Sequence, residues 1–347
     1  MADKVFLHIG APKTGTTFLQ QLMAANQEKL ASGGFLYAAG EHGSDRVWAT
    51  ELLRGRNLSK HPKPQAAQAW ERIRAQVGAW NGAAIFSHEF LGACSRQQAR
   101  RAMRDLAPAE VHVVFTARDY VRQAAAVWQE RLKYGLTDSL SDFTLDEGSS
   151  PPVWSWRTQD VPAILRRWSA DLPPERVHLV TVPSERGSPS VLWRRFASAV
   201  GIDPDSCEVT TARSNTSMGL VEAELLRQVN ERIGGRLEDV RERARWIRDL
   251  LANRVLVRRT GEAFSVSAEE AHRLRHRSLA AVEALSQAGY HVVGSLDDLI
   301  PPSDAATSLR AAADVTEGEL LDVAVDAIAD LLVVSARRDK RHGGRSP

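Results

Sequence analysis

The residues of this chain that are best suited to chemistry lie near its N-terminus, where residues 10–17 read Gly-Ala-Pro-Lys-Thr-Gly-Thr-Thr. Glycines let backbone amides approach an anion, and the first amides of a following helix have no acceptor within that helix. The hydroxyls of Thr14, Thr16 and Thr17 add further donors. Lys13 is informative because only 7 of the 45 basic residues are lysines. The loop therefore predicts a site for a phosphate-like anion.

The loop differs from that of a nucleotide kinase, which would read G-x-x-x-x-G-K-[ST]. Gly10 and Gly15 have the required spacing, but Thr16 stands where that motif has its lysine. The strand expected at 111–115 is followed first by Arg118, not by an acid for Mg²⁺. The magnesium–triphosphate apparatus is thus incomplete. A nucleotide-dependent kinase or NTPase with a degenerate loop stays open as an alternative, as does a glycine-bearing turn with an accidental lysine.

The elements that must position this loop alternate between short apolar strands and amphipathic helices. Strands are expected at 5–9, 83–86, 111–115 and 177–182. A helical pattern runs through Phe18, Leu19, Leu22 and Met23, and further helices are expected at about 64–80, 95–106 and 120–134, with 33–64 as loop and short helical pieces. This alternation predicts an α/β fold in three layers, a parallel β-sheet with helices on both faces.

The C-terminal part is predicted to be helical from about residue 213, with 3.6-residue spacing over 218–233, 236–258 and 267–288. We expect residues 1–300 to form the α/β domain and residues 301–347 to form an amphipathic helix and a tail, after the break at Pro301 and Pro302. Three roles are open to that last helix: packing on the body, pairing with a second subunit as a homodimer, or lying exposed.

Residues 12–17 resemble the 5′-phosphosulfate loop of the sulfotransferase family, which reads P-K-[ST]-G-T-[ST] after the first strand. The resemblance implies a P-loop-like architecture and the donor 3′-phosphoadenosine 5′-phosphosulfate (PAPS). It assigns the donor's 5′ end to Pro12, Lys13, Thr14, Gly15, Thr16 and Thr17.

The family's second signature is an arginine at the end of a later strand, matched here by Arg118, with a serine eight residues on that is Ala126 in this chain. Both family residues hold the 3′-phosphate, so Arg122 or Gln123 is expected to compensate. Arg213, in the segment 213–217, is the candidate for the basic segment that closes over the 3′-phosphate. By layout the resemblance covers about residues 4–290, and the first loop is its specific part.

Sulfuryl transfer, like phosphoryl transfer, depends mainly on alignment and charge stabilisation. Lys13 is expected to neutralise the leaving 5′-phosphate without a metal. The acceptor needs a base at the end of a neighbouring strand, and His88 and Glu89 follow the strand at 83–86. In the family a histidine or a glutamate after this strand is the base. The alternatives are a capping or core role for His88 and a surface ion pair for Glu89.

The composition excludes several other classes of function. A net charge of +2 gives no strong field for nucleic acid, and no apolar run approaches the ~18 residues of a membrane span. Two cysteines, Cys94 and Cys207, make neither a disulfide framework nor a cysteine-rich zinc site. We therefore expect a cytoplasmic PAPS-dependent enzyme with a small-molecule or saccharide acceptor. Trp154 and Trp156 are candidates to stack against that acceptor, with core packing as the alternative role. A non-catalytic nucleotide-binding relative is the remaining alternative.

Overall fold

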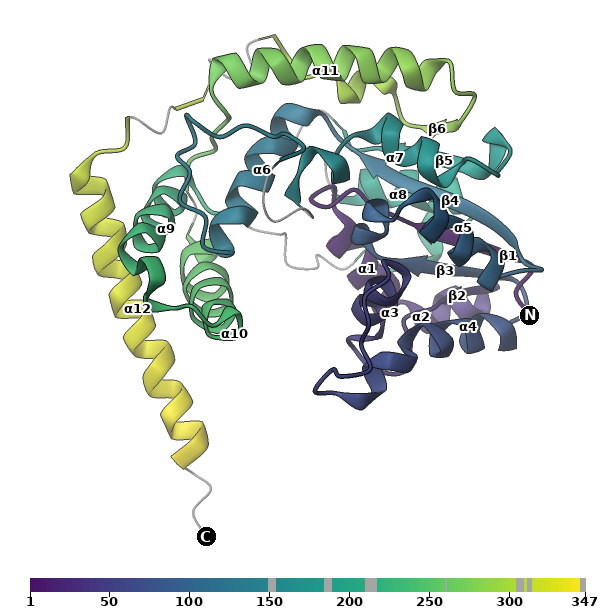
Figure 1. Cartoon of the computed structure of the whole chain (residues 1–347), viewed down its shortest axis with the longest axis horizontal. Helices are drawn as coiled ribbons and strands as arrows, with labels where there is room; N and C mark the ends of the chain where they lie inside the picture. Colours follow the sequence, from purple (N-terminus) through teal and green to yellow (C-terminus); the bar gives the residue numbers. More distant parts are fainter. Residues whose placement is uncertain are drawn as a thin grey trace. The chain divides into compact units, whose positions relative to one another are not determined.

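The computed structural model describes residues 1–148, 154–183, 189–209, 217–259, 261–303, 309–310 and 314–343 (Figure 1). Internal packing divides the chain into two compact units, each described here by itself. The first unit comprises residues 1–123, 145–214 and 275–301, and the second comprises residues 124–144, 215–274 and 302–347. The division of the chain at residue 300 stays a prediction.

The first unit is built on a six-stranded sheet in which all strands are parallel, in the order β2-β3-β1-β4-β5-β6. The strands are β1 (Lys4–His8), β2 (Phe35–Tyr37), β3 (Ala83–Ser87), β4 (Glu110–Ala117), β5 (Val177–Thr181) and β6 (His291–Val293). β4 lies inside the sheet and is buried along its length except at Glu110, as expected for a parallel strand covered on both faces. The predicted α/β fold with a parallel sheet is confirmed.

Helices cover both faces of this sheet because successive strand residues point to opposite sides. On one face, α1 (Thr16–Ala25), α2 (Gln27–Ser32) and α8 (Pro189–Val200) share a core with Phe6 and Val114. On the other face, α4 (Ala69–Ala79) packs Trp70 against Phe86, with ring centroids 5.6 Å apart, and α7 (Val161–Trp168) packs against β4.

Three further helices are α5 (Arg96–Asp105), α6 (Tyr120–Lys133) and α11 (Ala268–Ser286), and the start of α5 is marked in the sequence. α5 begins with a capping box between Ser95 and Gln98. α6 and α11 each have residues in both units.

α3 (Asp45–Leu53) and β2 lie within residues 33–64, where the sequence predicted loop and short helical pieces, so the strand there was missed. β6 was missed likewise, because a three-residue strand is too short to show a periodicity.

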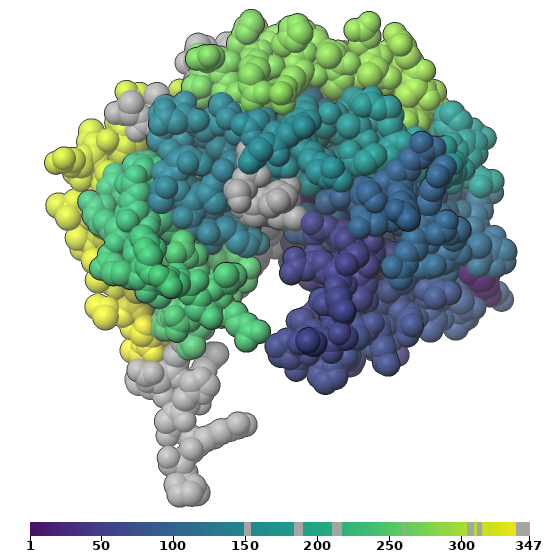
Figure 2. All heavy atoms as spheres, in the orientation of Figure 1, coloured from purple at the N-terminus to yellow at the C-terminus, as the bar shows by residue number. Residues whose placement is uncertain are grey.

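The second unit is helical, with α9 (Leu220–Ile233), α10 (Val240–Arg243), η8 (Ala244–Val255), η9 (Leu256–Arg258) and α12 (Glu317–Gly343). η8 has π-helical hydrogen bonding. α12 packs along α9 and η8, and Figure 2 shows its yellow atoms beside the green atoms of this unit. Among the described helices, none is long and apolar enough to cross a membrane.

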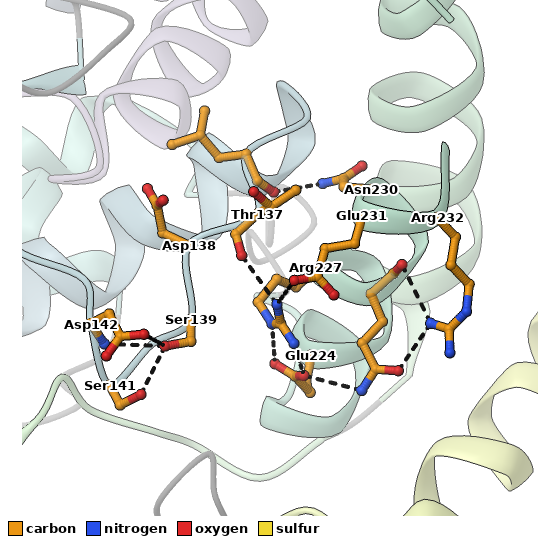
Figure 3. A network of polar contacts seen from close by, with 12 residues as sticks. Thr137, Asp138, Ser139, Ser141, Asp142, Glu224, Arg227, Asn230, Glu231 and Arg232 are labelled. Atoms are coloured by element: carbon orange, nitrogen blue, oxygen red, sulfur yellow. Dashed lines mark hydrogen bonds and ion pairs between the residues drawn. The ribbon is translucent and has the colours of Figure 1, made fainter. Parts of the chain in front are cut away.

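A network of polar contacts fastens the segment after α6 to α9 (Figure 3). Arg227 forms ion pairs with Glu224 and Glu231, at 2.7 and 2.6 Å, and its guanidinium donates to the Thr137 carbonyl at 3.1 Å. The Asn230 side-chain amide donates to the Leu136 carbonyl at 2.9 Å. These contacts, with a further hydrogen bond from Asn230 to the Leu132 carbonyl at 2.8 Å, hold residues 132–137 against α9.

Candidate functional site

The glycines of the loop after β1 are required by its backbone. Gly10 has φ 138° and Gly15 has φ 87°, a region that side-chain-bearing residues rarely adopt. A Cβ atom at Gly15 would collide with Leu192, and one at Gly10 would lie 2.9 Å from the Glu89 carbonyl oxygen. Lys13 itself has φ 66°, an uncommon conformation for a residue other than glycine. Such a conformation is typical of functional loops.

The start of α1 can receive an anion. Gly15 caps this helix without a side-chain hydrogen bond, and its first turn has no acidic residue. The first amides of α1 therefore have no intrahelical acceptor and sit at the positive end of the helix dipole. Thr16 and Thr17 begin the helix, where their amides would face such a ligand.

The Thr14 side chain fastens the loop to β4. Its hydroxyl donates to the Ala11 carbonyl and lies 2.6 Å from the hydroxyl of Thr116, which donates to the Gly10 carbonyl at 2.9 Å. The hydroxyl of Thr14 thus points toward the sheet. If Thr14 contributes to the predicted binding site for PAPS, it would do so through its backbone amide.

Arg118 brings the end of β4 to the loop. Its Nη1 donates to the Lys13 carbonyl at 3.1 Å, and its Nη2 donates to the Arg122 carbonyl. Its Nε is buried without a hydrogen-bond partner among the described residues. Burial lowers the pKa of this guanidinium to about 10, with Asp119 opposing and Arg122 adding to the effect. A buried cation with an unpartnered donor suits an anionic ligand.

The residues after Arg118 hold one another. The Asp119 carboxylate pairs with the Arg122 guanidinium and accepts the Arg122 amide at 2.8 Å. Arg122 also donates from Nη1 to the Pro183 carbonyl at 3.0 Å, while its Nη2 is buried without a partner in the described parts. The Gln123 side chain donates to the Pro12 carbonyl. Gln123 therefore supports the loop, and Asp119, the acid closest after β4, is engaged by an arginine.

His88 caps a short helix. Its Nδ1 accepts the Phe90 amide at 3.3 Å, at the start of η2 (Glu89–Ala93). A neutral ring that accepts at Nδ1 carries its proton on Nε2. Burial lowers the pKa of His88 to about 4, opposed by Glu89 and reinforced by Arg46 and Arg54, so the ring is neutral at neutral pH. The capping role left open by the sequence is thus present, and the role of base stays a prediction.

A buried polar network lies beneath Glu89. The Gln20 side-chain amide donates to Glu89 Oε2 at 3.3 Å and to Ser87 Oγ at 3.2 Å. His8 lies between Ser87 and Thr116, with its Nδ1 2.8 Å from Ser87 Oγ and its Nε2 3.2 Å from Thr116 Oγ1. Burial lowers the pKa of His8 to about 4. Gln20, on α1, therefore fixes the position of the Glu89 carboxylate.

Aromatic rings connect the candidate base to the candidate lysine. The His88 and Phe90 rings have centroids 5.7 Å apart, and Phe90 meets Trp154 edge to face at 5.3 Å. Lys13 Nζ lies 6.0 Å from the centroid of the Trp154 ring, at the outer limit of a cation–π contact. The structure thus brings together Lys13, His88 and Trp154. Trp156 instead packs against Tyr120, with Arg277 over its ring.

Several residues of this region were missed by the sequence interpretation: His8, Gln20, Tyr37, Arg46, Ser87, Phe90 and Thr116. Polar residues that end otherwise apolar strands, such as His8 and Ser87, are a signal that was available. Arg213, predicted at the 3′-phosphate, lies outside the described residues. In the described parts of the chain, no group of three His, Cys, Asp or Glu residues is arranged to hold a metal ion.

Comparisons with known proteins give one distant likeness. No family model and no curated protein matches the chain. A solved structure, a sulfotransferase from Alicyclobacillus acidocaldarius, matches 72% of this chain and 96% of its own, with 13% sequence identity and a TM-score of 0.39. A likeness this distant transfers neither residues nor activity.

Proposed function

We propose that this chain is a PAPS-dependent sulfotransferase that acts on a hydroxyl group, less favourably an amine, of a small molecule or saccharide. The observation that carries the proposal is the hydrogen bond from Arg118 to the carbonyl of Lys13, across 105 residues of sequence. It joins the two motifs that a 5′-phosphosulfate and a 3′-phosphate would need. The unpartnered buried nitrogens of Arg118 and Arg122 fit a phosphate on the same side of the loop.

The loop supplies charge stabilisation in this proposal. The bond between sulfur and the 5′-phosphate oxygen breaks as the acceptor oxygen bonds to sulfur, so negative charge grows on the phosphate. The Lys13 ammonium and the first amides of α1 would offset that charge. The acceptor's proton passes to a protein base, which balances the reaction.

Glu89 is the better of the two candidate bases. His88 uses Nδ1 as a cap, so the neutral ring carries its proton on Nε2 and has no free nitrogen to accept the proton of the acceptor hydroxyl. The Glu89 carboxylate is held by Gln20, so its second oxygen can face the acceptor. His88→Ala is then expected to perturb η2 and reduce turnover moderately. Glu89→Gln should reduce turnover more, with donor affinity nearly unchanged.

A nucleotide-dependent kinase remains the second candidate because Gly10 and Gly15 keep the spacing of a nucleotide loop. Against it stands Asp119, whose carboxylate is paired with Arg122 and caps α6. A Mg²⁺ site there would require breaking that pair.

The deciding experiment is a thermal-shift titration with adenosine 3′,5′-bisphosphate, with 5′-AMP and ATP–Mg²⁺ in parallel. A ligand that binds only the folded state adds about 2.7 kcal/mol of stability at 100 times its Kd. The proposal expects stabilisation by the bisphosphate well above that by 5′-AMP, followed by sulfuryl transfer in an acceptor screen. Stabilisation by ATP–Mg²⁺ alone would favour the kinase. Tight binding of the bisphosphate without transfer to any acceptor would favour a non-catalytic relative.

A further inference from the structure

Three buried polar atoms near the carboxyl end of β2 have no hydrogen-bond partner among the described residues: Tyr37 Oη, Arg46 Nη1 and Thr50 Oγ1. Tyr37 ends β2, and the other two residues lie one turn apart on α3. The Arg46 guanidinium lies over the Tyr37 ring, 5.6 Å from its centroid. A buried polar atom without a partner costs about 1–3 kcal/mol, so three of them in one region indicate a ligand that completes them.

This region adjoins the candidate base. β2 pairs with β3, which ends at Ser87, and α3 packs against η2, which begins at Glu89. In the sheet order β2-β3-β1-β4, the loop after β1 lies between β3 and β4. Arg118 follows β4, so the side of the loop toward β4 suits the donor. The acceptor would then bind on the opposite side of the loop, toward β2 and β3.

Arg46 differs from its neighbours in having no counter-ion. Two arginines near Arg46 each have a carboxylate partner. Arg54 pairs with Glu51 at 2.8 Å, and Arg72 pairs with Asp45 at 2.6 Å. No carboxylate lies within ion-pair distance of Arg46 in the described parts of the chain. The planar guanidinium matches the two oxygens of a carboxylate, and a tyrosine hydroxyl can donate to the same group.

We infer that Arg46 and Tyr37 bind a carboxylate carried by the acceptor, beside the hydroxyl that Glu89 would deprotonate. The inference rests on the proposed function and narrows its substrate class to hydroxyl compounds that bear a carboxylate, such as the uronic acid units of saccharides.

Thermal-shift titrations with D-glucuronate and D-glucose, with adenosine 3′,5′-bisphosphate present, test this subsite. We expect glucuronate, but not glucose, to stabilise the wild type, and Arg46→Gln to weaken glucuronate binding at least about tenfold, the loss of one charged hydrogen-bond pair. Arg56→Gln is the matched control, because Arg56 is exposed and pairs with Glu51. Equal binding of the two sugars, or unchanged binding by Arg46→Gln, would overturn the inference.

Two further readouts separate the possible failures. Tyr37→Phe removes only the unpartnered hydroxyl, so it should keep or raise Tm while it weakens glucuronate binding; unchanged glucuronate binding by a folded Tyr37→Phe protein would count against the subsite. If the bisphosphate stabilises both wild type and Arg46→Gln while glucuronate stabilises neither, the subsite fails and the proposed function stands. If the bisphosphate stabilises neither protein, the proposed function itself fails.

Discussion

Two clusters of buried polar groups occupy the same sheet, one in the amino-terminal halves of the strands and one at their carboxyl ends. In the first cluster, which we name the histidine row, His112, His178 and His291 follow one another across β4, β5 and β6. His112 Nδ1 lies 2.9 Å from His178 Nε2, and His178 Nδ1 lies 2.9 Å from His291 Nδ1. The row ends at Glu110, 2.8 Å from His112 Nε2.

The two clusters differ in whether their polar atoms are partnered. Both ring nitrogens of His112 and of His178 have a partner inside the row. At the carboxyl ends, nitrogens of Arg118, Arg122 and Arg46 are buried without one among the described residues. Both regions contain histidines and arginines, so residue type does not distinguish them. The two clusters are distinguished by whether their buried polar atoms have hydrogen-bond partners. A network in which these atoms are partnered indicates a structural role, whereas buried donors without a partner indicate a ligand.

The largest effect is expected at Lys13. Lys13→Ala should lower sulfuryl transfer by on the order of 10²–10³-fold or more, because it removes the charge that stabilises the leaving phosphate. The matched control is Lys4→Ala, at the other end of β1, where the lysine forms an exposed ion pair with Glu110 at 3.4 Å. Turnover should be measured beside Tm for both variants. A Lys13→Ala protein with near wild-type turnover would contradict the assignment of the carboxyl ends as the active site.

A smaller effect is expected at Arg118. Arg118→Met should weaken binding of adenosine 3′,5′-bisphosphate by about tenfold to a hundredfold, as for loss of a hydrogen bond to a charged group. Tm should also fall, because the Lys13 and Arg122 carbonyls lose their donor. Calorimetric titration measures the affinity. Arg176→Met, which removes an ion pair with Glu110 beside the histidine row, is the control and should leave the affinity unchanged. Equal affinities for the wild type and Arg118→Met would place the 3′-phosphate elsewhere.

The sequence predicted the part of this architecture that depends on local patterns. β1, β3, β4 and β5 are largely apolar, as expected of strands buried on both faces, and each was found within a few residues of its observed bounds. β2 and β6 have three residues each and no such run. Their places at the two edges of the sheet are fixed by pairing with β3 and β5, which no local pattern encodes.

The candidate site divides in the same way. Lys13 was predicted from the glycine-bearing loop and Arg118 from the family resemblance, and both follow parallel strands, whose carboxyl ends meet at one edge of the sheet. Gln20 and Arg46 lie on helices, where the packing of the helix decides which side chain meets Glu89 or Tyr37. In a chain with 38 arginines, nothing in the sequence marks Arg46 as one that keeps a buried nitrogen without a partner among the described residues.

Acid should destabilise both clusters. Burial lowers the pKa values of His8, His88 and His178 to about 4, against about 6.5 in an unfolded chain. Between these values the unfolded chain binds more protons, so the stability is fully present above pH 6.5 and falls as the pH drops toward 4. The slope is about 1.4 kcal/mol per pH unit for each such histidine.

Urea unfolding at a series of pH values measures this slope. His178→Phe should make it shallower by the share of one histidine, while His42→Gln, at an exposed position, should leave it unchanged. A slope that His178→Phe does not alter would mean that the histidine row is not a buried neutral network.

The smallest effect is expected at Glu110, where the histidine row meets solvent. Its pKa is lowered by the hydrogen bond from His112, with Arg176 and Lys4 adding to the effect, but its side chain is 36% exposed and its ion pairs are screened. Glu110→Gln keeps an oxygen that can accept from His112, so Tm should fall only slightly and turnover should not change. Since His112 is five residues upstream of Ala117, at the end of β4, a loss of turnover in this variant would show that strain in the row travels along the strand to Arg118. The two clusters would then be one system, and partnering alone would not separate structural from functional polar groups.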